Sequence, residues 1–116
     1  MTWQDDVVLE RALAAAREAK RACALATIIA TRGSTPRKVG AALVVDPETG
    51  LTGTVGGGCG EAEVIEAARR VLATGRPERV RVDLMESITS WSPAVCGGTM
   101  EVFVEFVPPG PLEEGA

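Results

Sequence analysis

Histidine is absent from this chain of 116 residues, and aromatic residues are scarce, with two tryptophans, two phenylalanines and no tyrosine. Without histidine there is no imidazole to act as a general base, to activate a serine or cysteine nucleophile, or to bind a metal. Few aromatic side chains mean that small aliphatic residues must fill the core. Any chemistry therefore depends on thiols, carboxylates, cations or the backbone.

Long hydrophobic runs and an excess of positive charge are missing too. The longest apolar run, residues 23–30, is far shorter than the roughly 20 residues of a membrane-spanning helix. A net charge of -4 argues against a nucleic-acid surface, whereas clustered cations can still bind a small anion. Three cysteines at irregular spacing indicate free thiols. We therefore expect a soluble, cytoplasmic protein that binds neither membranes nor nucleic acid.

The succession of apolar patterns predicts a single α/β layered domain over residues 1–107, with a mixed β-sheet of about five strands packed with two main helices. Helical spacing is found in residues 2–21 and 61–74. Strand patterns occupy residues 23–30, 41–45, 51–55, 79–84 and 100–107. The Pro- and Gly-rich tail 108–116 is expected to be disordered.

A glycine-rich segment precedes the second expected helix. It consists of Gly56, Gly57, Gly58, Cys59, Gly60 and Glu61. Bare backbone N–H groups at a helix start attract anions, and the same field favours a thiolate at Cys59. A tight turn with a small buried cysteine explains the pattern about equally well. Glu61 is the one carboxylate in this helix for which we predict a function, because the helix dipole accounts for the others.

A nucleotide site is an alternative interpretation of these glycines. The order of strand, glycines, helix, strand and Asp83 fits the dinucleotide-binding fingerprint, but Glu61 stands where its third glycine belongs. A P-loop is excluded because the chain has no Gly-Lys pair. A NAD-type binding fragment of an oxidoreductase is therefore the second hypothesis, and a structural subunit of a multi-chain dehydrogenase is the third.

A cationic loop, Gly33–Gly40, follows the first expected strand. It places Arg37 and Lys38 after Pro36, with the hydroxyl of Ser34 nearby. The planar guanidinium group suits phosphate, while an ordinary solvated loop is the plain alternative.

A third segment, Cys96-Gly97-Gly98, puts a second thiol beside bare backbone. Zinc is disfavoured because the chain lacks four ligands at the usual spacing. Two glycine-flanked thiols suit a soft ligand such as molybdenum or copper(I), and a redox disulfide is a further alternative. Cys23 opens an apolar strand and is assigned to the core.

Together, Gly33–Gly40, Gly56–Glu61 and Cys96–Gly98 resemble, in order and spacing, the N-terminal domain of the XdhC/CoxI family, over roughly residues 5–107. The resemblance implies an accessory protein, or chaperone, that binds molybdenum cofactor (molybdopterin in its mono- or dinucleotide form). It would protect the cofactor while its sulfido ligand is installed and deliver it to an apoenzyme of the xanthine dehydrogenase or carbon monoxide dehydrogenase type. It favours a carrier over an enzyme.

The resemblance also implies partners and roles. Besides the molybdenum hydroxylase apoenzyme, these are a cysteine desulfurase and a separate Rossmann-type chain; the small size of the domain adds a homodimer. Arg37, Lys38 and the amides of Gly56–Gly58 would hold the phosphate, and Cys59 or Cys96 would approach the metal. Ser34, Glu61, Gly97 and Gly98 complete the expected cofactor site, and no residue is expected to be catalytic. Gly60 stands where family members usually have an apolar residue, and we expect it to loosen the helix start.

Overall fold

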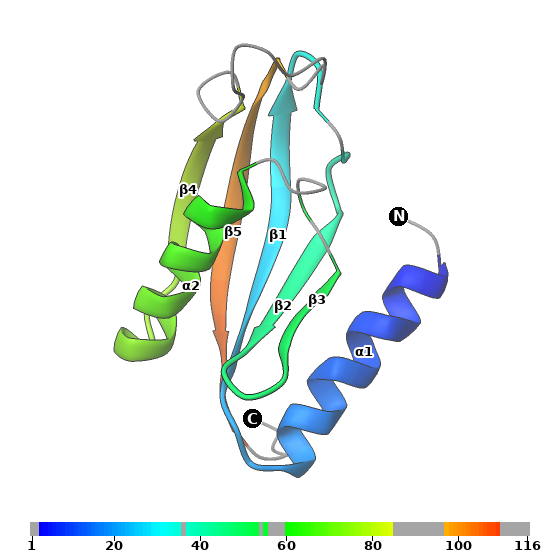
Figure 1. Ribbon diagram of the computed structural model, residues 1–116, viewed down its shortest axis with the longest axis vertical. Helices are drawn as coiled ribbons and strands as arrows, with labels where there is room; N and C mark the ends of the chain where they lie inside the picture. Colours follow the sequence, from blue (N-terminus) through cyan, green and yellow to red (C-terminus); the bar gives the residue numbers. More distant parts are fainter. Residues whose placement is uncertain (1–2, 36, 54, 56–59, 85–96, 110–116) are drawn as a thin grey trace, which may run out of the picture.

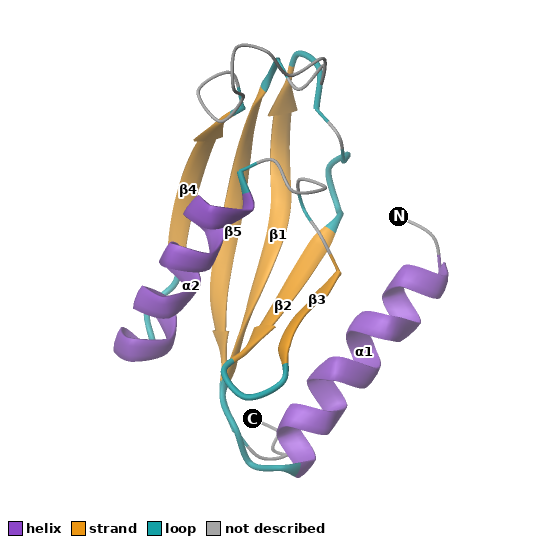
Figure 2. Ribbon diagram, in the orientation of Figure 1, coloured by secondary structure: helices purple, strands orange, loops and turns teal. Residues whose placement is uncertain are grey.

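The structure is a computed structural model that describes residues 3–35, 37–53, 55, 60–84 and 97–109. Within these residues the chain forms one five-stranded sheet and two helices, as predicted for an α/β domain (Figures 1 and 2). Neither helix is long and apolar enough to cross a membrane. The elements are α1 (Trp3–Glu18), β1 (Cys23–Arg32), β2 (Ala42–Asp46), β3 (Gly50–Gly53), α2 (Glu61–Thr74), β4 (Glu78–Asp83) and β5 (Thr99–Val107).

All described strand pairs are antiparallel, which corrects the expectation of a mixed sheet. The strand order is β3-β2-β1-β5-β4. α2 carries the chain from the edge strand β3 to the opposite edge strand β4, so it does not join two neighbouring parallel strands (Figure 1). β5 then returns between β4 and β1, antiparallel to both.

α2 covers one face of the sheet and forms the larger core with β1, β4 and β5. Its apolar residues recur at helical spacing and therefore lie on one side of the helix. The buried ones are Val64, Ala67, Ala68 and Val71. Because two of the four are alanines, the helix can approach the sheet closely, which suits a core with few aromatic rings.

α1 packs on the other face, over β2 and β3. Its buried residues Leu9 and Ala16 contact a cluster that includes Cys23, Ala42 and Val44. β2 contributes residues to both core clusters, and all five of its residues are buried. In β1, Cys23 belongs to the cluster under α1, whereas Ala24 and Ala26 belong to the core under α2, so its apolar stretch does not require parallel neighbours.

One part of the sheet has no helix over it. On the face that carries α1, the described chain places no helix on β4 and β5. Arg79 and Arg81 of β4 are exposed there, and Glu101 and Phe103 of β5 are half-buried. We call this region, defined by these four residues, the open face.

Gly60 starts α2 in a left-handed conformation, with φ of 75°. It is buried, and a Cβ atom on it would overlap Cγ1 of Val82 and lie 3.2 Å from Cδ2 of Leu84. Glycine tolerates both the positive φ and the close approach. Gly60 therefore packs the helix start tightly against β4, and the expected loosening is wrong.

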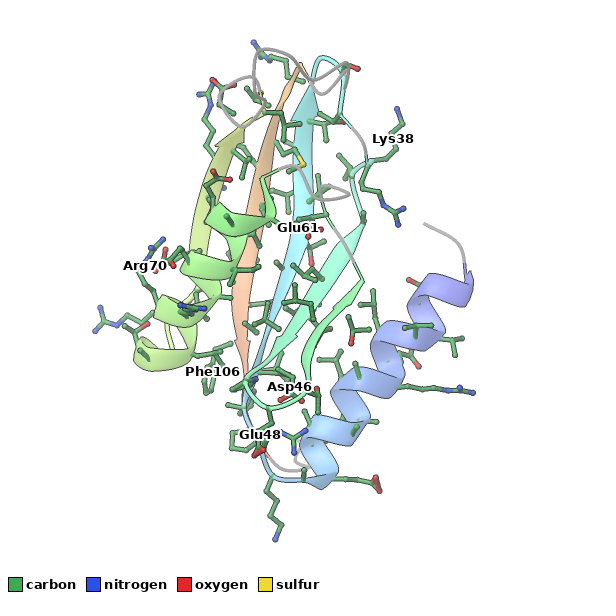
Figure 3. The ribbon with its side chains drawn as sticks, viewed as in Figure 1. Lys38, Asp46, Glu48, Glu61, Arg70 and Phe106 are labelled. Carbon is green, nitrogen blue, oxygen red and sulfur yellow. The ribbon has the colours of Figure 1, made fainter. Side chains whose placement is uncertain are left out.

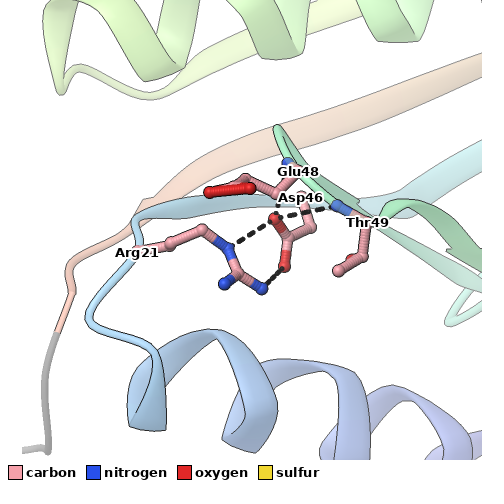
Figure 4. Close-up of polar contacts among 4 residues, drawn as sticks. All are labelled: Arg21, Asp46, Glu48 and Thr49. Carbon is pink, nitrogen blue, oxygen red and sulfur yellow. Dashed lines mark hydrogen bonds and ion pairs between the residues drawn. The ribbon is translucent and has the colours of Figure 1, made fainter.

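The end of the sheet where β1 begins is held by an ion pair between half-buried Arg21 and buried Asp46 (Figure 4). Nε and Nη2 of Arg21 donate to Oδ1 and Oδ2 of Asp46, at 3.0 and 2.9 Å. The same carboxylate accepts the backbone N–H groups of Glu48, at 2.9 Å, and Thr49, at 3.4 Å. The side chain of Asp46 is 4% exposed. These donors, Arg21 first, hold the pKa of Asp46 well below its usual range.

Candidate functional site

Two of the three sequence segments meet at the end of the sheet where β1 ends and β5 begins. The N–H of Gly97 donates to the carbonyl oxygen of Ser34 at 3.1 Å. A Cβ on Gly33 would lie 3.1 Å from Cα of Gly98, and one on Gly98 would overlap the carbonyl oxygen of Arg32. Because backbone packs directly on backbone here, side chains at either glycine would force the two segments apart.

The start of α2 belongs to the same end of the molecule. Gly60 packs on Leu84, whose N–H donates to the carbonyl oxygen of Gly98 at 2.9 Å. Glu61 follows in the first turn of the helix and is half-buried. Figure 3 shows Glu61 and Lys38 in the same half of the molecule, on separate elements. The described parts of all three sequence segments are thus gathered at one end.

The cationic loop holds its own shape. The hydroxyl of Thr35 donates to the carbonyl oxygen of Arg37 at 3.0 Å, and the N–H of Ala41 donates to that of Lys38 at 3.1 Å. Ser34 and Lys38 are exposed, and Arg37 is half-buried. The hydroxyl proton of Thr35 is therefore engaged within the loop, while Ser34 and Lys38 face solvent.

The predicted cofactor-binding residues are thus partly assembled by the described structure. Ser34 contacts Gly97, Gly98 packs against the same loop, and Arg37 and Lys38 lie in that loop. The remaining candidates lie outside the described residues: Gly56, Gly57, Gly58, Cys59 and Cys96.

Comparison with known proteins identifies the family. The profile of the XdhC and CoxI family matches residues 16–83, which is more than half of the chain. This chain belongs to the XdhC and CoxI family. The matched range contains the cationic loop and the glycine-rich segment, and it ends before Gly97 and Gly98.

Two relatives of this family member are similar over only part of their own length. The uncharacterized protein YqeB of Escherichia coli (strain K12) is 35% identical over 81 residues, which cover 70% of this chain and 15% of YqeB. A crystal structure of a xanthine dehydrogenase from Bacillus halodurans has a TM-score of 0.68 and 29% identity, covering 82% of this chain and 29% of that one. The chain therefore spans less than a third of either protein.

Cys23 of this XdhC/CoxI family chain lies away from the gathered segments. It is fully buried at the start of β1, while the cationic loop follows the last residue of that strand. Burial raises the pKa of its thiol, which favours an unreactive core cysteine, as predicted. Among the described residues, no group of three or more Cys, Asp or Glu side chains is placed to hold a metal ion.

A hollow lies beside the gathered segments, and no sequence pattern predicted it. It has a volume of about 250 Å³ and is lined by Ala30, Thr31, Arg32, Arg81, Thr99 and Glu101. Arg79 and Arg81 alternate with Val80 and Val82 along β4, a pattern that predicts only that the arginines face solvent. Which residues of β1 and β5 they face depends on strand register, and no local pattern in the sequence reveals that register.

Proposed function

We propose that this chain is the cofactor-holding domain of an accessory protein that carries molybdenum cofactor to a hydroxylase of the xanthine dehydrogenase or carbon monoxide dehydrogenase type. Family membership supports the link to such enzymes. The observation that carries the proposal is the contact between the cationic loop and Gly97–Gly98 at the end of the sheet where α2 begins. Segments far apart in the sequence are thereby combined into one surface.

The anionic part of the cargo fits this surface. Molybdopterin carries a phosphate group, and Lys38 and Ser34 are exposed residues of the cationic loop that offer an ammonium group and a hydroxyl. Arg37 belongs to the same loop, and guanidinium groups suit phosphate. Gly33 and Gly98 let the two segments pack backbone on backbone, which holds Ser34 against Gly97 at this surface. These residues bind and orient the cargo.

The metal end of the cargo is assigned to Cys59 and Cys96, on their glycine-flanked sequence positions. Molybdenum prefers soft ligands, and a thiolate is such a ligand. When bound, the cargo supplies the molybdenum and its sulfido group, whereas the chain contributes the binding groups. The role is therefore that of a carrier.

Equilibrium binding of molybdopterin under anaerobic conditions tests this role. The variant Cys59→Ala/Cys96→Ala is expected to bind at least about tenfold more weakly, and Cys23→Ala, the matched control, to bind as the parent does. Undiminished affinity of the double variant would refute the thiol role. A preference for NAD over molybdopterin would refute the carrier role as a whole.

The NAD-type alternative has little support in the geometry. Its fingerprint belongs to a parallel βαβ unit, whereas α2 here links strands at opposite edges of an antiparallel sheet. The structural-subunit alternative predicts a permanent stoichiometric complex with a hydroxylase, whereas a carrier should leave after delivery. Co-purification under native conditions separates the two.

The proposed partners of the carrier follow from the resemblance. They are the hydroxylase apoenzyme, a cysteine desulfurase that supplies sulfur, and a separate Rossmann-type chain. We also propose a homodimer in the cytoplasm, because a domain of this size gains stability by burying more surface. Gel filtration with light scattering should give twice the monomer mass, and a monomer at high concentration would refute the dimer.

A further inference from the structure

A β-bulge in β1 decides which of its residues lie on the open face. The register with β5 shifts between Ile28 and Ala30, so that Ile29 is an extra residue on this strand. Because side chains alternate along a strand, the extra residue reverses the alternation from there on. Ala30 and Arg32 therefore share a face with their partners on β5, Glu101 and Thr99 respectively. Bulges of this kind often re-aim side chains beside functional sites.

The bulge creates the hollow described above. Arg32 lies opposite Thr99 on β5, and Arg81 on β4 lies opposite Glu101, two residues further along. From strand spacing, the Cα atoms of the two arginines are roughly 12 Å apart, with β5 between them. Ala30, next to Glu101, is too small to fill the space between them. A hollow of about 250 Å³ results.

The two arginines of the hollow differ from others in the molecule. Arg21, Arg70 and Arg79 each form an ion pair with a carboxylate. Arg32 and Arg81 are exposed, and neither forms a salt bridge within the described part of the chain. Among the described residues that line the hollow, two guanidinium groups stand against one carboxylate, Glu101, whose Oε1 also lies 4.0 Å from Nη1 of Arg79. These residues therefore carry a surplus of positive charge, although the protein is acidic overall.

We infer that this hollow binds a small phosphorylated compound, whose phosphate lies between Arg32 and Arg81. Each guanidinium can donate two parallel hydrogen bonds to a phosphate, and the hydroxyl of Thr99 adds a donor. Glu101 accepts a hydrogen bond from an N–H group of the same compound, so the site selects phosphorylated amines. Asp83, the neighbour of Thr99 on β4, does not line the hollow. The inference is independent of the molybdenum-cofactor proposal.

Titration of the full chain followed by backbone amide NMR tests the phosphate part. With inorganic phosphate, saturable shifts are expected at Arg32, Arg81 and Thr99. Arg32→Gln and Arg81→Gln should each weaken binding at least about tenfold, while Arg76→Gln, an exposed arginine outside the hollow, should change it less than twofold. Equal effects of all three variants, or shifts that never saturate, would refute the site.

Two further comparisons test selection and guard against misfolding. Phosphoethanolamine should bind more tightly than glycerol phosphate. Glu101→Gln should remove this preference and should strengthen the binding of inorganic phosphate. An unchanged preference would refute the role of Glu101. If Arg81→Gln loses its dispersed spectrum, Arg81→Lys keeps the charge without the planar fork and should show intermediate affinity; parent-like affinity would contradict the two-arginine clamp.

Discussion

The two ends of the sheet use polar groups in opposite ways. At the end where β1 begins, which we call the closed end, half-buried Arg21 pairs with the buried carboxylate of Asp46, which also accepts backbone N–H groups. At the opposite end, which we call the glycine end, Gly98 packs on Gly33 and the charged group of Lys38 is exposed.

The difference shows how stability and binding are divided over the molecule. At the closed end, charged side chains hold the elements together, so they are not available to a ligand. At the glycine end, backbone contacts hold the segments, and the polar side chains of Ser34 and Lys38 face solvent. Binding groups on a loop fixed by a rigid scaffold are typical of functional sites. The predictions below test this division.

Gly98→Ala should have the largest effect on the stability of the fold. Its Cβ would overlap the carbonyl oxygen of Arg32 and lie 2.9 Å from the backbone N of Ser34, so main chain must move. We expect the free energy of unfolding to fall by about 3 kcal/mol, measured by urea denaturation. Gly75→Ala is the control, because Gly75 has φ of 75° and no neighbour within 4 Å; about 1 kcal/mol is expected there. Equal losses would mean that the glycine end is loosely packed.

Asp46→Ala should rank second. It removes a carboxylate that is 4% exposed and leaves Arg21, whose side chain is 23% exposed, without its ionic partner. Because Arg21 can reach water, we expect a loss of about 2 kcal/mol, less than for a fully buried pair. A double-mutant cycle with Arg21→Ala measures the coupling in the same denaturation assay. Strict additivity would show that the pair does not stabilise the closed end.

Acid should weaken the closed end through the same pair. Arg21 lowers the pKa of Asp46 in the folded state below its unfolded value of about 3.9. The contribution is therefore complete above the unfolded pKa and is lost as pH falls below it. Between about pH 5 and pH 2, we expect the parent to lose about 1–2 kcal/mol more stability than Asp46→Asn. Urea midpoints across this range provide the measurement, and parallel curves for the two proteins would contradict the prediction.

Local sequence patterns predicted most of the elements, because each one depends on neighbours along the chain. The spacing of Val64, Ala68 and Val71 placed α2 over residues 61–74, as observed. Strand direction was the exception. An apolar run such as that of β1 looks the same in the sequence whether the neighbouring strands are parallel or antiparallel. The prediction of a mixed sheet was therefore wrong, although the predicted helices and strands were found.

The candidate site was predictable in its parts and not in its geometry. Ser34, Lys38 and Gly97 could be found because glycine, cations and hydroxyls interrupt apolar patterns. Their contact depends on β1 and β5 being neighbours, which no local pattern specifies. The hollow depended on an extra residue, Ile29, in a strand whose sequence runs on without interruption.

Lys38→Gln should have the smallest effect on stability and a clear effect on binding. Lys38 is exposed in the cationic loop, so the free energy of unfolding should change by less than about 0.5 kcal/mol. Removal of one charge–phosphate contact should weaken molybdopterin binding about tenfold in the proposed carrier. Lys20→Gln is the matched control, since Lys20 is an exposed lysine near the closed end and should leave binding unchanged. If both variants weaken binding equally, the ligand responds to overall charge and the two ends do not differ as proposed.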